Sequence, residues 1–312
     1  MELVLLFPGQ GSQKPGMGKD LSEAEPAARE VFDAVDRALR TPLARLCFEG
    51  PAEELTLTHN AQPALFAHGA AAWAAVRARV SPQVVAAAGH SLGEFTAYSA
   101  SGALSIAAGA RLVRRRGELM LEAGKARSGA MAAILGDLAE PIEALCDRAS
   151  AEAGEVVPAN YNSPGQVVVS GEVDGVERVM AMAKGAGAKR AVRLAVSGAF
   201  HSPLMAAAAD GLKAALYEAG IGAPAVPVYS NVTALAVLEA GEARELLLRQ
   251  LTSPVRWTSV VESLAAAYPG ALFVELGPGN VLTGLVKRIA PGVATATCGT
   301  AAEVEALVQR LS

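Results

Sequence analysis

The chain has 312 residues, of which 52% are hydrophobic and 19% charged, so it can bury a large core and is not a disordered polypeptide. Its formal net charge of −4 gives no general attraction to nucleic acid, and we expect no nucleic-acid partner. Its three cysteines, Cys47, Cys146 and Cys298, are widely spaced and form no metal-ligand pattern, so we expect no metal site and a reduced, cytoplasmic setting.

The first part of the chain alternates short apolar runs with helical stretches. The run Leu3 to Phe7 is too short for a signal or membrane segment, so we predict a first core strand there and no membrane-spanning segment. Helical spacing of apolar residues follows at 27–40 and 62–79, and the run Val84 to Ala88 predicts a second buried strand, followed by a helix from Glu94. This alternation is typical of an α/β layer structure with a mainly parallel sheet.

A different pattern begins at Gly129. The elements predicted between residues 129 and 196 follow the order βαββαβ of a ferredoxin-like unit, and the α/β alternation then resumes. We therefore predict a large α/β-hydrolase-like domain, residues 1–126 and 197–312, interrupted by a small ferredoxin-like domain, residues 127–196. The predicted elements are strands at 131–135, 156–161, 166–170, 190–196, 226–230 and 272–276, and helices at 139–150, 174–186, 203–219, 242–251, 258–267 and 281–289.

A Gly-x-Ser-x-Gly motif joins the predicted strand at 84–88 to the helix after it. The motif reads Gly89-His90-Ser91-Leu92-Gly93. In a nucleophile elbow, glycines at these two positions let the chain turn sharply without a Cβ clash, and the serine hydroxyl is exposed at the carboxyl end of the strand. We therefore predict that Ser91 is a nucleophile rather than an ordinary helix-capping serine.

A histidine that serves as the base for Ser91 must be one of four. His90 adjoins Ser91 in sequence, which normally points its side chain away, and His59 and His68 belong to no motif and are assigned structural roles. His201 follows the predicted second crossing from the small to the large domain, where the chain returns to the sheet. We predict His201 as the general base, because a neutral imidazole can accept the serine proton.

One arginine of the predicted helix at 105–121 points toward the apolar side. At helical spacing Arg116 shares a face with apolar residues, whereas Arg111, Arg114 and Arg115 point outward. An inward guanidinium requires an anion, because burying an unpaired charge is energetically unfavourable. The sequence is compatible with two anions: an internal aspartate or glutamate, and a substrate carboxylate held by the planar guanidinium.

Six motifs stand in order along nearly the whole chain: Phe7-Pro8-Gly9-Gln10-Gly11-Ser12-Gln13, Gly89-His90-Ser91-Leu92-Gly93-Glu94, Asn160-Tyr161-Asn162-Ser163-Pro164-Gly165-Gln166, Gly198-Ala199-Phe200-His201-Ser202, Gln250-Leu251-Thr252-Ser253-Pro254-Val255 and Glu275-Leu276-Gly277-Pro278-Gly279. Together they closely resemble the malonyl-CoA:acyl carrier protein transacylase family of fatty-acid synthesis. The resemblance implies that Ser91 accepts the acyl group, His201 acts as base and Arg116 binds the malonyl carboxylate. The motifs and spacing considered by themselves select the same three residues.

The resemblance also implies further site residues. Backbone N–H groups of Gln10 and Leu92 would form the oxyanion hole, since a glycine-rich loop lets the first approach and the second opens the helix after the elbow. This family usually orients its histidine with a main-chain carbonyl rather than an acidic side chain, and Ser253 is the candidate for that role. The candidate pocket-lining residues are Gln62, His90, Asn160 and Phe200.

By this resemblance the serine takes malonyl from malonyl-CoA and passes it to the phosphopantetheine thiol of an acyl carrier protein, and neither metal nor cofactor is implied. Docking of an acidic carrier protein requires a local basic surface. The candidates are Lys189, Arg190, Lys287 and Arg288. Three alternatives stay open: a polyketide-type acyltransferase with another extender unit, a serine esterase of the α/β-hydrolase class, and an inactive carrier-protein-binding module.

Overall fold

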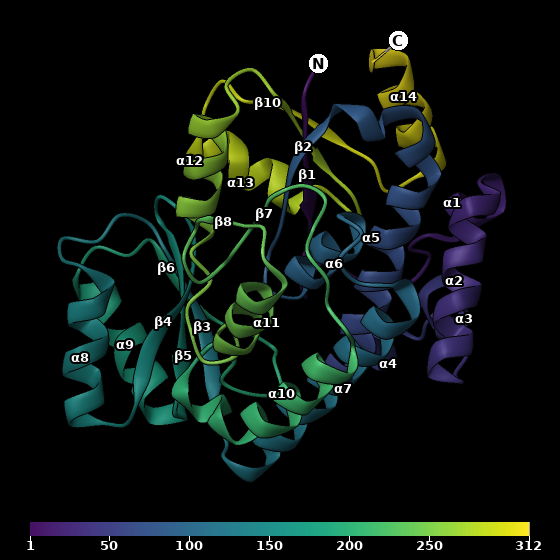
Figure 1. Ribbon diagram of the computed structural model, residues 1–312. Coiled ribbons are helices and arrows are strands. Elements are labelled where there is room, and N and C mark those ends of the chain that lie inside the picture. Colours follow the sequence, from purple (N-terminus) through teal and green to yellow (C-terminus); the bar gives the residue numbers. More distant parts are fainter. Residues whose placement is uncertain (312) are drawn as a thin grey trace.

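The central sheet is built around β1 (Leu3–Phe7), which has a parallel partner on each side in the computed structural model of residues 1–311 (Figure 1). Its strands lie in the order β10-β9-β1-β2-β7-β8, and every neighbouring pair is parallel except β7 and β8. This arrangement confirms the predicted α/β structure with a mainly parallel sheet. The other strands are β2 (Val84–Gly89), β7 (Val228–Tyr229), β8 (Ala236–Val237), β9 (Leu272–Glu275) and β10 (Ala294–Thr297).

Helices cover both faces of this sheet, as a largely parallel sheet requires. In β1, Leu3, Leu5 and Phe7 belong to the largest apolar cluster, whereas Val4 and Leu6 belong to a second cluster on the opposite face. The first face is covered mainly by α2 (Pro26–Leu39), α5 (Thr58–Val80) and α7 (Ile106–Ala126), and the second by α12 (Trp257–Ala267) and α13 (Val281–Ile289). The carboxyl ends of the parallel strands meet at one edge, where open α/β sheets form their ligand sites.

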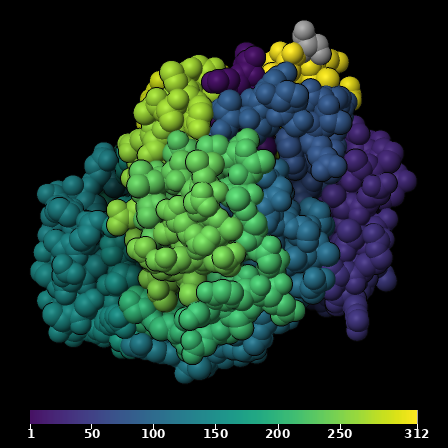
Figure 2. All heavy atoms as spheres, in the orientation of Figure 1, coloured from purple at the N-terminus to yellow at the C-terminus, as the bar shows by residue number. Residues whose placement is uncertain are grey.

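The second sheet is antiparallel throughout, with the strand order β4-β5-β3-β6. Two helices pack on one of its faces, and in Figure 2 the residues of this segment, coloured teal, gather on one side of the molecule. Its elements are β3 (Ala130–Leu135), α8 (Ile142–Glu152), β4 (Val156–Ser163), β5 (Gln166–Gly171), α9 (Val173–Gly185) and β6 (Arg190–Arg193).

The other face of the second sheet is joined to the large part of the molecule. Side chains of β3 alternate, so that Ala132 and Ile134 pack in the cluster under α8 and α9, whereas Met131 belongs to the largest apolar cluster. The backbone of Val255 bonds to β4 in both directions, donating to the carbonyl of Ala159 at 2.8 Å and accepting from the N–H of Tyr161 at 2.9 Å. The small sheet is therefore fixed to the large part by both packing and main-chain hydrogen bonds.

Most predicted elements are present, and the differences have local causes. The strand expected at 190–196 ends at Arg193, and residues 194–196, which follow it, line a pocket. The helix expected at 203–219 begins as a 3₁₀ helix, η2 (Pro203–Ala208), and continues as α10 (Ala209–Glu218). The elements that were not predicted are mostly short or, like β10, lack large apolar residues. They are α1 (Lys19–Ala24), α3 (Leu43–Glu49), α4 (Ala52–Thr56), η1 (Ser81–Gln83), β8, β10 and α14 (Ala301–Leu311), while α11 (Ala240–Arg249) matches a predicted helix.

The three cysteines are free and buried, and burial raises the pKa of each thiol to about 12. Within residues 1–311, no group of three or more His, Cys, Asp or Glu side chains is arranged to hold a metal ion. None of the helices in this range is both long and apolar enough to cross a membrane.

Candidate active site

Ser91 stands at the sharp turn between β2 and α6 (Leu92–Ala100). Its backbone has φ 50° and ψ −107°, a conformation that an L-residue adopts only when its surroundings hold it there. The two motif glycines serve close packing rather than unusual dihedrals. A Cβ at Gly89 would lie 1.9 Å from the carbonyl carbon of Gly93, and a Cβ at Gly93 would lie 2.0 Å from the oxygen of Phe7. The sequence therefore forms the predicted elbow, with the strained residue being the serine itself.

His201 lies within hydrogen-bonding distance of this serine. Its Nε2 is 2.7 Å from Ser91 Oγ, and its Nδ1 is 2.9 Å from the carbonyl oxygen of Gln250. Because a carbonyl can only accept, Nδ1 carries the ring proton and Nε2 is free to accept the serine proton. The backbone of Ser253 was the predicted orienting group. The 2.9 Å contact belongs instead to the backbone of Gln250, and the backbone of Ser253 interacts with the ring more weakly.

The pKa of His201 is lowered to about 3. Burial is the main cause, the positive charge of Arg116 adds to it, and the hydrogen bond to the Gln250 backbone opposes it. The side chain is only 4% exposed. His201 is therefore neutral near pH 7, which is the protonation state that a general base needs.

This depressed pKa predicts a pH dependence of stability. Between about pH 6.5 and 3 the unfolded state binds a proton at His201 that the folded state does not, so stability falls as the pH falls through this range. His201→Gln removes this titration. We expect the wild type to lose stability relative to this variant by up to about 1.4 kcal/mol per pH unit on acidification. Urea unfolding of both proteins from pH 7 to 4 measures the difference, and parallel curves would contradict the assigned pKa.

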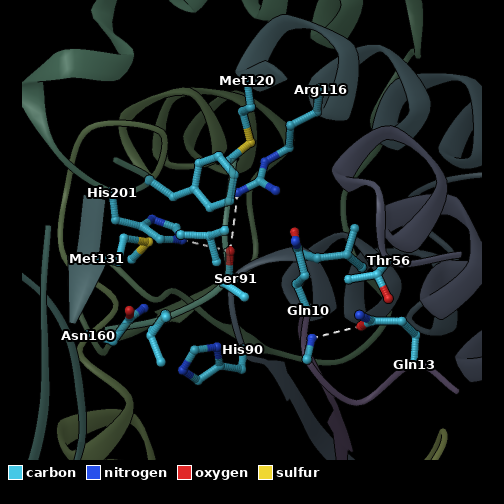
Figure 3. Close-up of a pocket in the computed structure, with 16 residues that line it drawn as sticks. Gln10, Gln13, Thr56, His90, Ser91, Arg116, Met120, Met131, Asn160 and His201 are labelled. Carbon is cyan, nitrogen blue, oxygen red and sulfur yellow. Dashed lines mark hydrogen bonds between the residues drawn. The ribbon is translucent and has the colours of Figure 1, made fainter. Parts of the chain in front are cut away.

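Arg116 projects from α7 toward the same serine and is 2% exposed. Its Nη1 donates to Gln62 Oε1 at 2.8 Å, and its Nη2 donates to Gln250 Oε1 at 2.9 Å and to Ser91 Oγ at 3.2 Å. Figure 3 shows Arg116 and His201 both pointing toward Ser91. The prediction that Arg116 faces inward is confirmed.

The partners of Arg116 are neutral amide oxygens. Among the described residues no carboxylate forms a salt bridge with it, and its Nε is buried without a hydrogen-bond partner. Burial lowers the pKa of Arg116 to about 10, with a partly compensating effect from the charge of Glu94, so the guanidinium remains cationic at pH 7. No internal acid of the described chain contacts Arg116 directly; the buried Glu94 compensates its charge only in part and is linked to it through Gln250. A buried cation next to the nucleophile is instead available to an anionic ligand.

Two backbone N–H groups near Ser91 are available to a ligand. Within residues 1–311, the N–H of Leu92, at the first position of α6, and the N–H of Gln10, in the loop after β1, have no acceptor. The adjacent backbone N–H groups already have acceptors: Ser91 N donates to Asn231 Oδ1 at 2.7 Å, and Gly11 N donates to Gln13 Oε1 at 2.7 Å. Both Gln10 and Leu92 line the pocket that contains Ser91.

That pocket has a volume of about 320 Å³ and receives residues from both parts of the molecule. The predicted lining residues His90, Asn160 and Phe200 do line it, together with Met120 and Met131. Gln62 does not; it is 1% exposed and lies behind Arg116, where it holds the guanidinium. The further lining residues are Gln10, Gly11, Gln13, Thr56, Ser91, Leu92, Arg116, Leu194, Ala195, Val196 and His201.

The remaining histidines take no part in the Ser91 contact. The ring of His90 lies on the far side of Ser91 from Arg116 (Figure 3), with its Nε2 2.8 Å from Asn162 Oδ1 and its ring against Trp257. His68 is buried with its Nε2 2.7 Å from the carbonyl oxygen of Gly299. His59 is partly buried and lies outside the pocket. A neutral histidine and a buried cation thus converge on Ser91, beside two available N–H donors.

The sequence matches the acyl transferase domain family over residues 4–308. A malonyl CoA-acyl carrier protein transacylase of Bacillus subtilis is 46% identical over 311 residues, which cover 99% of this chain and 97% of the relative. The chain belongs to the malonyl-CoA:acyl carrier protein transacylase family.

Solved structures agree with this family assignment. The acyl-carrier-protein S-malonyltransferase of Bartonella henselae is 43% identical and superimposes with a TM-score of 0.94, covering 100% of this chain and 99% of its own. A malonyl-transacylase solved in complex with a holo acyl carrier protein of type II polyketide synthesis is 40% identical, with a TM-score of 0.93 over 99% of this chain and 100% of its own.

Three residues that hold the site of this transacylase family member were not predicted. Gln250 stands in a motif that sequence analysis recognised, yet its contacts with both His201 and Arg116 depend on how the chain folds back after α11. Glu94 ends the elbow motif and is the one charged residue of α6, which is a signal that sequence reasoning could have used. Asn231 carries no signal in a single sequence.

Proposed function

We propose that this chain transfers a malonyl group from malonyl-CoA to the phosphopantetheine thiol of an acyl carrier protein, through a malonyl ester on Ser91. The observation that carries the proposal is the buried Arg116, which forms no salt bridge within residues 1–311 and has its Nη2 3.2 Å from Ser91 Oγ. In a malonyl thioester the free carboxylate is separated from the reacting carbonyl by one methylene group. A cation this close to the nucleophile can therefore bind the carboxylate while the carbonyl is attacked.

In the first half-reaction, Ser91 Oγ attacks the thioester carbonyl carbon as His201 Nε2 takes the hydroxyl proton. The negative charge on the carbonyl oxygen is stabilised by the N–H groups of Leu92 and Gln10. The carbon–sulfur bond then breaks, and His201 returns the proton to the sulfur, releasing coenzyme A as a thiol. Malonyl remains on Ser91 as an ester.

In the second half-reaction, the carrier-protein thiol takes the place of coenzyme A. His201 accepts the thiol proton while the sulfur attacks the ester carbonyl, and the bond to Ser91 Oγ breaks as the proton returns to that oxygen. The products are malonyl-carrier protein and free Ser91. Two half-reactions through one covalent ester give ping-pong kinetics. The proposed steps use protein side chains, two backbone N–H groups and thioester chemistry, and the proposal includes no metal or redox cofactor.

The rival functions differ from this one in what they need from the site. An esterase of the α/β-hydrolase class has no need of a buried cation beside its serine. An inactive binding module has no need of a serine–histidine contact of 2.7 Å. A polyketide-type acyltransferase shares the mechanism and differs in the acyl group, and one similar structure holds a polyketide carrier protein. Competition between malonyl-CoA and methylmalonyl-CoA for Ser91 separates that alternative.

The proposal extends to the domain arrangement and the cellular setting. Residues 1–126 and 197–312 form the large α/β-hydrolase-like domain, and residues 127–196 form the inserted ferredoxin-like domain. The βαββαβ order and the strand order β4-β5-β3-β6, with two helices on one face, support the second assignment. A cytoplasmic location fits three free cysteines and a substrate made from coenzyme A.

Incubation with malonyl-CoA followed by intact-mass measurement tests the proposal directly. We expect the mass of one malonyl group to be added, and to disappear when a holo acyl carrier protein is supplied. A protein that acquires no adduct would contradict the malonyl-serine mechanism.

A further prediction concerns carrier-protein docking. Lys189 and Arg190 are exposed on the small sheet and form no salt bridge within the described chain, and residues 194–196, shortly after them, line the pocket. Carrier proteins are typically acidic, so we expect Lys189→Glu with Arg190→Glu to raise KM for the carrier protein several-fold, as the loss of charges at the rim of a protein interface does. KM for malonyl-CoA should stay nearly unchanged. Lys287 and Arg288 are exposed on α13, where Arg288 reaches Gln166 of the small sheet, and are the second pair to test.

The control for this docking prediction is Lys19→Glu with Arg37→Glu. These two residues are exposed on α1 and α2, at the opposite side of the molecule from the small sheet (Figure 1), and the change in net charge is the same. Steady-state kinetics with each substrate varied in turn measures both KM values. Equal effects of the two double variants, or equal effects on both substrates, would contradict docking at Lys189 and Arg190.

A further inference from the structure

A buried carboxylate lies behind the pocket and touches neither the pocket nor solvent. Glu94, in the first turn of α6, is 0% exposed. Its Oε2 accepts two hydrogen bonds, from the backbone N–H of Asn231 at 3.0 Å and from Gln250 Nε2 at 2.7 Å. Its Oε1 is buried without a partner. All of its hydrogen bonds therefore run through one oxygen to two residues that each bond to the elbow.

The first of these residues, Asn231, spans the strained elbow. Its Oδ1 accepts from the backbone N–H of Ser91 at 2.7 Å, and its Nδ2 donates to the carbonyl of Gly89 at 2.7 Å. The side chain is fully buried. A serine at φ 50° keeps its conformation only if the surrounding groups over-determine it, and these two hydrogen bonds do so across the turn.

The second residue, Gln250, connects the elbow to Arg116. Its Nε2 donates both to Glu94 and to the carbonyl of Ser91, the latter at 3.1 Å, and its Oε1 accepts from Arg116 Nη2 at 2.9 Å. Because Glu94 Oε2 and the Ser91 carbonyl both accept hydrogen bonds, they select the amide orientation in which Gln250 Nε2 faces them, with Glu94 making the shorter contact. The amide oxygen is then turned toward the guanidinium.

We propose that Glu94 and Asn231 are positioning residues: Asn231 fixes the nucleophile elbow, and Glu94 holds Asn231 and also orients Gln250, which aims Arg116. The elbow part of this inference is independent of the substrate, whereas the part that concerns Arg116 rests on the proposed function. Neither residue lines the pocket, so both act through the residues that do.

The acceptor role of Glu94 Oε2 does not depend on its charge. Burial raises the pKa of Glu94 to about 7, against the opposing effects of the hydrogen bonds from Asn231 and Gln250 and of the nearby Arg116. The other titratable group that faces it is the buried hydroxyl of Tyr98, on the same helix. When Glu94 is protonated, the proton belongs on the unpartnered Oε1, and Oε2 still accepts from both residues. Glu94→Gln preserves the same acceptor and is the conservative replacement.

The reaction of Ser91 with phenylmethanesulfonyl fluoride tests the elbow without using a malonyl substrate. The rate is followed by intact mass in Glu94→Ala, Asn231→Ala and Glu94→Gln. We expect the two alanine variants to react about 10- to 100-fold more slowly than the wild type, since small misplacements of a nucleophile have effects of this size, and Glu94→Gln to stay within about threefold. If Glu94→Ala does not fold, Glu94→Asp, which withdraws the carboxylate by one methylene group, takes its place with the same expectation.

The matched control is Glu275→Gln. Glu275 is another buried glutamate that accepts two backbone hydrogen bonds, from Leu282 at 3.0 Å and Thr283 at 2.7 Å, but it stands outside the pocket. It controls for the loss of a buried carboxylate, and its sulfonylation rate should equal that of the wild type. Folded Glu94→Ala and Asn231→Ala proteins that react as fast as Glu275→Gln would overturn the proposal.

Loading with malonyl-CoA and acetyl-CoA separates the roles of the two residues. Asn231→Ala disturbs the elbow alone, so both loading rates should fall by the same factor. Glu94→Ala also removes the shorter of the two hydrogen bonds that hold the Gln250 amide facing Arg116, so malonyl loading should fall further than acetyl loading. An unchanged malonyl-to-acetyl ratio in Glu94→Ala would overturn the link to Arg116. A wild type that loads no malonyl, while the sulfonylation rates follow the expected order, would remove the proposed function and leave the elbow inference standing.

Discussion

Replacing Ser91 with alanine is expected to abolish covalent malonyl loading and to leave the fold intact. Ser91 is the elbow residue, and His201 Nε2 and Arg116 Nη2 both converge on its Oγ. In serine enzymes the loss of the nucleophile lowers turnover by on the order of a millionfold. Intact-mass measurement after incubation with malonyl-CoA should therefore show only the unmodified protein.

Ser101→Ala is the matched control for this experiment. Ser101 is a buried serine at the other end of α6, where its hydroxyl bonds to the carbonyl of Tyr98 at 2.9 Å. That variant should load malonyl like the wild type. A malonyl adduct on Ser91→Ala would show that another group accepts the acyl chain and would remove Ser91 as the nucleophile.

The alternation of apolar runs and the elbow motif were sufficient to predict the α/β class, the central strands and the position of Ser91. These features are local, because an apolar run fits a buried strand and a Gly-x-Ser-x-Gly sequence fits one kind of turn. The inward direction of Arg116 was also accessible, since it follows from helical spacing alone. The short strands β8 and β10 were not, because their residues are paired by tertiary contacts rather than by an apolar pattern.

The support of the site was the part that sequence reasoning missed. Gln250 contacts His201 through its backbone and Arg116 through its side chain, and these contacts join α7, the segment between β6 and η2, and the turn after α11. Gln62 was expected to line the pocket, but its amide is used to hold Arg116. A glutamine amide can either line a polar pocket or hold a guanidinium. Only its neighbours in the folded structure determine which of the two it does. Residues that face the substrate can thus be recognised in the sequence by their residue type. The residues that support them can be recognised only from the folded structure.

Replacing Arg116 with alanine is expected to change the choice of substrate. If the guanidinium holds the malonyl carboxylate, its loss removes a desolvated, charge-assisted pair worth about 2–5 kcal/mol, or roughly 30- to 5,000-fold in malonyl loading. Acetyl-CoA has no carboxylate and should lose nothing comparable. The predicted result is a large fall in the malonyl-to-acetyl loading ratio, measured by intact mass in competition and by each rate alone.

A purely structural arginine would produce a different result. It would lower the loading of both substrates together and would lower thermal stability as well.

Arg114→Ala is the matched control, because Arg114 lies on the same helix, is partly buried and bonds to Asn60 at 2.7 Å, yet stands outside the pocket. Arg116→Lys adds a second control, since it retains the charge and loses the planar two-point geometry, and it should recover only part of the malonyl rate. Because Arg116 bonds to neutral amides and forms no direct salt bridge within the described residues, the alanine variant should remain folded. An unchanged loading ratio in that folded protein would remove Arg116 from the substrate site.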